Sequence, residues 1–105
     1  MATPKIIRHS EAATTTGVVQ ILGAEKAFFK DYALQIKGVG AGATSWSVTV
    51  DVSLDGSNWT TVLTHNATDG SVASVVDKPG AWIRINVGSL TLGSATAITC
   101  TLIAQ

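Results

Sequence analysis

The sequence predicts an all-β protein, a single antiparallel β-sandwich or jelly-roll-like domain of about seven to eight strands. Three observations predict this fold class. Apolar and polar residues alternate over several short runs, as side chains do on the two faces of a strand. Turn signals that contain Gly, Asn, Asp or Pro separate the runs at intervals of about ten residues. No segment has a convincing helical period, and no internal repeat is visible.

Residues 44–63 carry the clearest pattern. The apolar positions alternate with polar ones and predict a long strand with one buried and one outer face. The turn signal over residues 55–58 ends this strand, and alternation resumes at Trp59, so the segment reads as a β-hairpin. A slip of one residue would expose the whole apolar set, which fixes the register. The expected inner side chains are Trp46, Val48, Val50, Val52 and Leu54, and the expected outer ones are Ser45, Ser47, Thr49, Asp51 and Ser53.

The other elements follow in order along the chain. Residues 1–17 hold Pro4 and a short apolar pair, Ile6 and Ile7, followed by a small, polar and non-periodic stretch at residues 11–17. We expect an extended N-terminal arm over residues 1–17, with the sandwich domain spanning residues 18–105. We expect further strands at residues 18–22, 27–37, 71–76, 81–87 and 96–103, and turns or loops at 23–26, 38–42, 64–70, 79–80 and 88–93. The expected core lies on the apolar sides of these runs and comprises Trp46, Val48, Val50, Val52, Ile83, Ile85, Ile98 and Leu102.

Composition excludes several classes of partner. Charged residues make up 13% of the 105-residue chain and the formal net charge is zero, so the sequence has no electrostatic footprint for nucleic acid or an anionic membrane. No apolar run is long enough for a membrane span, and residues 1–10 lack the apolar core of a signal peptide, so we expect a chain that is not secreted by such a signal. The one cysteine, Cys100, alternates with Ile98 and Leu102 and is expected to be a small buried hydrophobe.

No constellation of residues indicates an enzyme or a metal site. The two histidines, His9 in the arm and His65 in a predicted solvated loop, lie in no catalytic or zinc-binding pattern. The oxygen-bearing residues from Asp51 to Asn58 resemble the opening of a helical calcium loop. That loop needs a Glu at its twelfth position, where this chain has Val62. We therefore expect no catalytic residue, no cofactor and no bound metal.

Candidate interface residues come from the strand at residues 81–87 and from the arm. Trp82, Arg84 and Asn86 occupy the outward positions of that strand, and Trp and Arg are enriched at the centres of protein interfaces. Ile6 and Ile7 form an isolated apolar pair in the arm that could anchor on a neighbouring subunit. A small neutral sandwich also has sheet edges to cover, so we expect a homo-oligomer.

The hairpin at residues 45–63, the segment at 79–87 and the Thr-rich last strand together resemble small β-sandwich virion proteins of tailed bacteriophages, of the capsid decoration or cement type. The resemblance implies a non-enzymatic subunit that binds the major capsid protein on the outside of the head and stabilises it. It also implies a location in the virion and a symmetric oligomer, with a trimer favoured over a dimer. It transfers no functional residue to this chain.

Two alternatives remain open: a tail or baseplate-associated structural module and a carbohydrate-binding β-sandwich. A sugar-binding face needs several exposed aromatic side chains next to Asn, Asp or Gln. We expect Trp46 and Trp59 in or near the core, which leaves Trp82 and Tyr32 for such a face. A single exposed tryptophan makes a thin platform.

Overall fold

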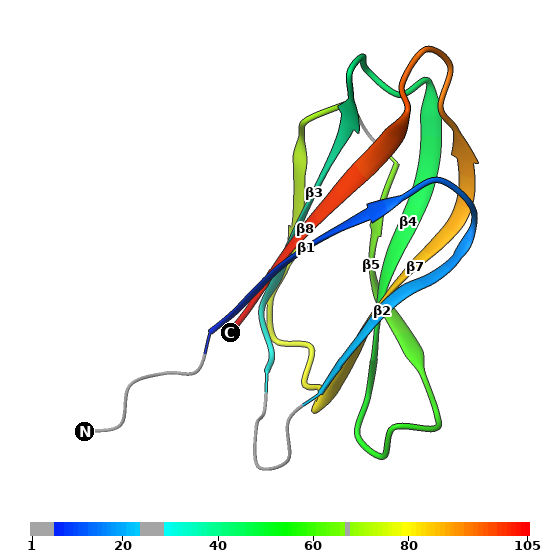
Figure 1. The fold of residues 1–105 in the computed structure, drawn as a ribbon. Coiled ribbons are helices and arrows are strands. Elements are labelled where there is room, and N and C mark those ends of the chain that lie inside the picture. Colours follow the sequence, from blue (N-terminus) through cyan, green and yellow to red (C-terminus); the bar gives the residue numbers. More distant parts are fainter. Residues whose placement is uncertain (1–5, 24–28, 67) are drawn as a thin grey trace.

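The computed structural model describes residues 6–23, 29–66 and 68–105, and it confirms an antiparallel β-sandwich. The first sheet has the strand order β1-β8-β3-β6, and the second has the order β2-β7-β4-β5 (Figure 1). The strands are β1 (Ile7–Ala13), β2 (Gly17–Gly23), β3 (Tyr32–Val39), β4 (Ser45–Ser53), β5 (Thr60–His65), β6 (Val72–Val75), β7 (Trp82–Thr91) and β8 (Ala97–Ala104).

The predicted hairpin is the pair β4–β5. In the described part of the chain, it is the one pairing between strands that follow each other in sequence. Every other connection between consecutive strands crosses from one sheet to the other, so β7 lies between β2 and β4 while β8 lies between β1 and β3. The fold therefore rests mainly on contacts between residues far apart in sequence. Proteins with such topologies fold slowly, because the entropy cost of closing long loops precedes the gain from non-local pairs.

The core lies between the sheets and confirms the predicted alternation. All eight expected core residues are buried, and Tyr32, Leu34 and Ile36 of β3 join them. Cys100 is fully buried as expected, and burial, with a smaller contribution from the charge of Glu11, raises the pKa of its thiol to about 11. Leu54 is the exception among the expected inner residues of the hairpin. It lies beyond the end of β4 and is 68% exposed.

The N-terminal segment differs from the extended arm expected over residues 1–17. Residues from Ile7 to Ala13 form β1, which pairs with β8 from Ile7 opposite Ala104 to Ala13 opposite Ile98. The sandwich therefore includes residues before 18. The alternation pattern did not predict this strand, because an edge strand has a neighbour on one side only and tolerates polar residues such as Ser10. Residues 1–5 lie outside the described part.

Strand ends also differ from the predicted ones. The predicted turn at residues 88–93 is wrong in its first half, because β7 continues to Thr91 and absorbs Gly88 as an extra residue opposite β4. The predicted strand at 27–37 begins in part outside the described residues, as does the predicted turn at 23–26; the described strand, β3, runs from Tyr32 to Val39.

Candidate functional site

His65 is a buried structural residue, which corrects the expectation of a solvated loop histidine. It is the last residue of β5, is 1% exposed, and its Nδ1 accepts a 3.0 Å hydrogen bond from the indole N–H of Trp46. Its Nε2 lies 2.7 Å from the carbonyl oxygen of Ser71. Because an indole only donates and a carbonyl only accepts, the proton of the neutral ring resides on Nε2. The Nδ1 bond thus links β5 to β4 within the second sheet, and the Nε2 bond links β5 to the segment before β6 of the first sheet.

A polar cluster lies on the outer face of the second sheet. Asp51 of β4 accepts a 2.8 Å charge-assisted hydrogen bond from Nε of Arg84 in β7 and a 2.7 Å bond from the hydroxyl of Thr61 in β5. The guanidinium carbon of Arg84 lies 4.7 Å from the centre of the Trp59 ring, within cation–π range. Trp59 therefore packs on the outer face, and the expectation that it belongs in or near the core is wrong.

The loop between β4 and β5 folds back over this face. Gly56 has φ of 80°, and a Cβ at this position would lie 3.3 Å from the indole ring of Trp82. Asp51 and Ser53 lie on the outer face, opposite Arg84 and Trp82, yet they are only 2% and 3% exposed. Arg84 and Thr61 contact Asp51, and the loop residues Asp55 and Gly56 contact Ser53. Trp82 keeps 38% of its surface exposed even though Gly56 approaches its ring.

Asp55 organises the loop and leaves little for a metal ion. Its Oδ1 accepts from the backbone N–H groups of Ser57 and Asn58 at 2.8 Å and from the hydroxyl of Ser53, and its Oδ2 accepts from the Asn58 amide at 2.7 Å. These hydrogen bonds, led by that from the Asn58 backbone, lower the pKa of Asp55 well below its ordinary value. The residues that resembled a calcium loop therefore form a self-contained turn.

Asp69 plays a similar part for the loop between β3 and β4. Its Oδ1 accepts from the backbone N–H groups of Gly38 at 2.7 Å and Ala43 at 3.3 Å, and Lys37 lies 3.6 Å from its Oδ2. The bond from Gly38 is the main cause of the lowered pKa of Asp69. One carboxylate thus fixes the loop after β3 in place.

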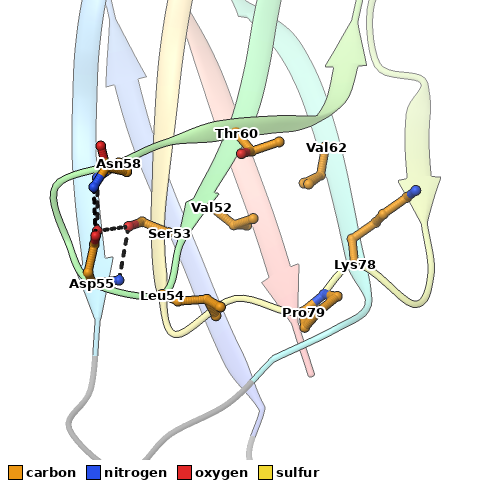
Figure 2. A pocket seen from close by; sticks show the side chains of 9 residues that line it. All are labelled: Val52, Ser53, Leu54, Asp55, Asn58, Thr60, Val62, Lys78 and Pro79. Atoms are coloured by element: carbon orange, nitrogen blue, oxygen red, sulfur yellow. Dashed lines mark hydrogen bonds between the residues drawn. The ribbon is translucent and has the colours of Figure 1, made fainter.

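A pocket of about 410 Å³ opens beside the hairpin loop, and Figure 2 shows the side chains around it. We call it the hairpin pocket. Its lining residues are Val52, Ser53, Leu54, Asp55, Asn58, Thr60, Val62, Lys78 and Pro79. Val52 supplies a buried floor, and the segment before β7 supplies the opposite wall through Lys78 and Pro79 (Figure 2).

The hairpin pocket arises from two irregularities that the alternation pattern did not predict. The register between β4 and β5 shifts so that Val62 is an extra residue between Thr61 and Leu63, and it lines the pocket. Gly80 packs so closely on Val52 that a Cβ there would approach the Val52 Cβ to 2.6 Å. The sequence signals for the site were the turns predicted at residues 55–58 and 79–80, which contribute Asp55, Asn58 and Pro79 to its lining. The pattern did not reveal that these two turns face each other.

The predicted interface residues do not form one surface with the N-terminal segment. Ile6 is 59% exposed at the start of the described chain, whereas Ile7 is half-buried against the core at the edge of the first sheet. Trp82, Arg84 and Asn86 share the outer face of the second sheet. Exposed apolar residues of β2 lie beside them, since Val18 pairs with Asn86 and Ile21 with Arg84. We call Val18, Ile21 and Trp82 the apolar strip.

The described residues contain no group of three or more potential metal-ligating side chains. His9 contacts Glu11 at 3.1 Å on β1, while His65 is on β5 in the other sheet. In the described ranges there is also no helix long and apolar enough to cross a membrane.

Comparison of whole folds places the chain among β-sandwiches of this size. No protein-family profile matches the sequence, and no curated protein sequence matches it. The fold is similar to that of YomS, a protein derived from the SPBc2 prophage, with a TM-score of 0.56 at 17% identity, covering 99% of this chain and 97% of YomS. It is also similar to the Yersinia pseudotuberculosis-derived mitogen, with a TM-score of 0.54 at 14% identity, covering 98% of this chain and 86% of the mitogen.

Proposed function

We propose that the chain is a non-enzymatic structural protein of a bacteriophage virion, most specifically a capsid decoration or cement protein that binds the major capsid protein on the outer surface of the head. The observation that carries the proposal is the likeness of its fold to that of a prophage-derived protein, which covers 99% of this chain and 97% of the other. The resemblance of residues 45–63 and 79–87 to virion sandwiches points the same way. A fold alone does not define a role, so the proposal needs a direct test.

The contacts of the ionisable side chains agree with a structural role. Asp51, Asp55 and Asp69 each accept hydrogen bonds that fix a strand or loop of their own chain, and His65 joins the two sheets. A catalytic carboxylate or imidazole instead needs a lone pair or proton directed at a substrate. These groups are used for architecture.

Self-association is the second part of the proposal, with a trimer favoured by the resemblance and a dimer as the alternative. Two residues of the apolar strip, Val18 and Ile21, lie on β2, an edge strand of the second sheet, and the third, Trp82, lies on the neighbouring strand β7. Burial of this strip against a second copy would remove exposed apolar surface and cover a sheet edge at once. Arg84 and Asn86 would lie within the contact, and Ile6 would add a peripheral one.

A carbohydrate-binding module is the second candidate, and one structural observation favours it. Trp59 lies on the outer face together with Trp82, Arg84 and Asn86, so this face carries two tryptophans rather than one. However, Arg84 covers one side of the Trp59 ring and Gly56 approaches that of Trp82, which reduces the ring area open to a sugar. A tail or baseplate module remains the third candidate.

The test is to purify virions of the phage that encodes the chain, separate heads from tails and identify the proteins of each by mass spectrometry. We expect the chain in the head fraction, removable from intact shells and able to rebind them as an oligomer. Its presence in the tail fraction alone would support a tail module. Absence from virions, together with binding of the purified chain to a glycan array, would overturn the proposal in favour of a carbohydrate-binding module.

Two variants locate the contacts. Trp82→Ala should weaken self-association or shell binding while the far-ultraviolet circular dichroism stays β-type, because Trp82 is on an outer face. Removal of residues 1–6 tests the peripheral contact and stops short of β1, whose loss would damage the sandwich. If both variants assemble and bind shells like the parent, the proposed contacts are wrong even if the virion role holds.

A further inference from the structure

The hairpin pocket has an apolar interior, and its lining combines apolar and polar residues. Val52 is 5% exposed and forms its floor, Val62 and Pro79 add to the walls, and Leu54 stands at the opening with 68% of its surface exposed (Figure 2). The volume of about 410 Å³ lies in the range of roughly 300–1,000 Å³ typical of ligand-binding pockets. An apolar side chain that entered the pocket would bury both its own surface and that of Leu54.

The two charged residues of the pocket lining, Asp55 and Lys78, differ in how far their own chain engages them. The Asp55 carboxylate is directed at the Ser53, Ser57 and Asn58 donors of its own turn. Lys78 is the other charged residue of the lining, and among the described residues no carboxylate lies within ion-pair distance of its ammonium group. The neighbouring Asp77 pairs instead with Lys30, at 3.5 Å. Of the two charged residues in the lining, Lys78 is therefore the one whose charged group is not engaged by its own turn.

We propose that the hairpin pocket binds an extended segment of a partner protein that inserts one large aliphatic side chain against Val52 and Val62 and places a carboxylate beside Lys78. A protein segment suits the site because β5 is one of the two edge strands of the second sheet, so the pocket adjoins backbone groups that no other described strand pairs. The inference rests on the proposed function in one respect only: if the chain decorates a capsid, the segment belongs to the major capsid protein.

Three matched pentapeptides test the chemistry without any assumption about the virus. They are acetyl-Gly-Glu-Leu-Glu-Gly-amide, its Gln-Leu-Gln form and its Glu-Ser-Glu form, each added to the full ¹⁵N-labelled chain in an NMR titration. We expect the first to shift amide signals of pocket-lining residues saturably. The Gln form should bind about two- to fivefold more weakly, since an exposed ion pair contributes that much. The Glu-Ser-Glu form should not saturate, and added salt should narrow the Glu to Gln difference.

Variants at exposed positions keep the fold intact and assign the effect to the pocket. Leu54→Ser should weaken binding of the Glu-Leu-Glu peptide about threefold or more, and Lys78→Gln should remove its advantage over the Gln form. The matched controls are Val72→Ser, which removes an exposed apolar side chain of the first sheet, and Lys37→Gln, and neither should alter binding.

Three results would overturn the inference: equal shifts with all three peptides, shifts that map away from the hairpin pocket, or tighter binding of octanoate than of the Glu-Leu-Glu peptide, which would indicate a site for small amphipathic acids. Failure of the proposed function is separable from these. A chain absent from virions that still binds the Glu-Leu-Glu peptide keeps the pocket inference. A chain that rebinds shells equally well as Leu54→Ser and Lys78→Gln keeps the virion role and loses the pocket as the shell contact.

Discussion

Polar side chains on the outer faces of the two sheets find their hydrogen-bond partners in different surroundings. On the first sheet, Ser10 of β1 and Thr101 of β8 share a hydrogen bond of 3.0 Å in the open, and small hydroxyl-bearing residues are left to water. On the second sheet, Asp51 is buried and paired with Arg84, Trp59 packs on the guanidinium group, and Gly56 of the hairpin loop approaches the Trp82 ring. The hydroxyl pair of the first sheet is solvated, whereas the carboxylate of the second sheet is buried by side chains of its own chain.

The difference shows where a polar residue on a sheet contributes to stability. An exposed hydroxyl pair replaces hydrogen bonds with water, so its net contribution to stability is small. A buried carboxylate has lost its water, and if a partner is removed the cost of that desolvation is no longer offset. The energetic importance of a polar side chain therefore follows from what covers it rather than from its place in the alternation. The predictions below test this difference from the largest expected effect to the smallest.

Loss of the buried carboxylate should have the largest effect. Asp51→Ala leaves Arg84 and the Thr61 hydroxyl without their buried acceptor, and we expect the free energy of unfolding to fall by about 3 kcal/mol. Urea unfolding followed by tryptophan fluorescence measures this. The double variant Asp51→Ala with Arg84→Ala should lose less than the sum of the two single variants, because the two side chains interact. Strict additivity would contradict the coupling.

Closure of the loop over the face should depend on Gly56. Gly56→Ala introduces a left-handed alanine and also a contact with the Trp82 ring, and we expect a loss of about 2 kcal/mol. Gly70 is a matched control, because its φ of 81° is the same but a Cβ there would meet nothing within 4 Å. Gly70→Ala should therefore cost about 1 kcal/mol, the backbone strain alone. Equal losses would mean that the loop does not rest on Trp82.

Acid should weaken the two carboxylate-anchored loops. The pKa values of Asp55 and Asp69 are lowered in the folded chain by hydrogen bonds from the backbone. The unfolded chain therefore binds these protons first, so the stabilisation is complete above about pH 4 and is lost as the pH falls through the lowered values. Thermal unfolding between about pH 5 and 2 should show a decline that is shallower in Asp69→Asn than in the parent. An unchanged slope would mean that Asp69 does not anchor its loop.

The solvated face should respond least. Ser10→Ala removes one exposed hydroxyl from the pair with Thr101, and we expect the free energy of unfolding to change by less than about 0.5 kcal/mol. The same urea experiment measures it beside Asp51→Ala. A loss comparable with that of Asp51→Ala would mean that the first sheet is covered in solution, for example by a second copy of the chain.

Strict alternation made the core and the hairpin predictable. A residue in the middle of an alternating run, such as Val50 or Ile85, can reach only one face, so its burial follows from the sequence. The same rule placed Cys100 correctly. It failed where the chain leaves regular pairing: the extra residue Val62 and the end of β4 at Ser53 changed which side chains face the pocket.

The sequence by itself determined the all-β class, the β4–β5 pairing and most of the core, because alternation and turn residues are local properties. Only the tertiary structure decided that β1 is an edge strand, that His65 joins the two sheets, and that Trp59 lies over Arg84 instead of in the core. It also decided that the hairpin loop faces Lys78 and Pro79 across a pocket. Apart from the bond between His65 and Ser71, these features join residues far apart along the chain, and their energies depend on burial, which exists only once both sheets are packed.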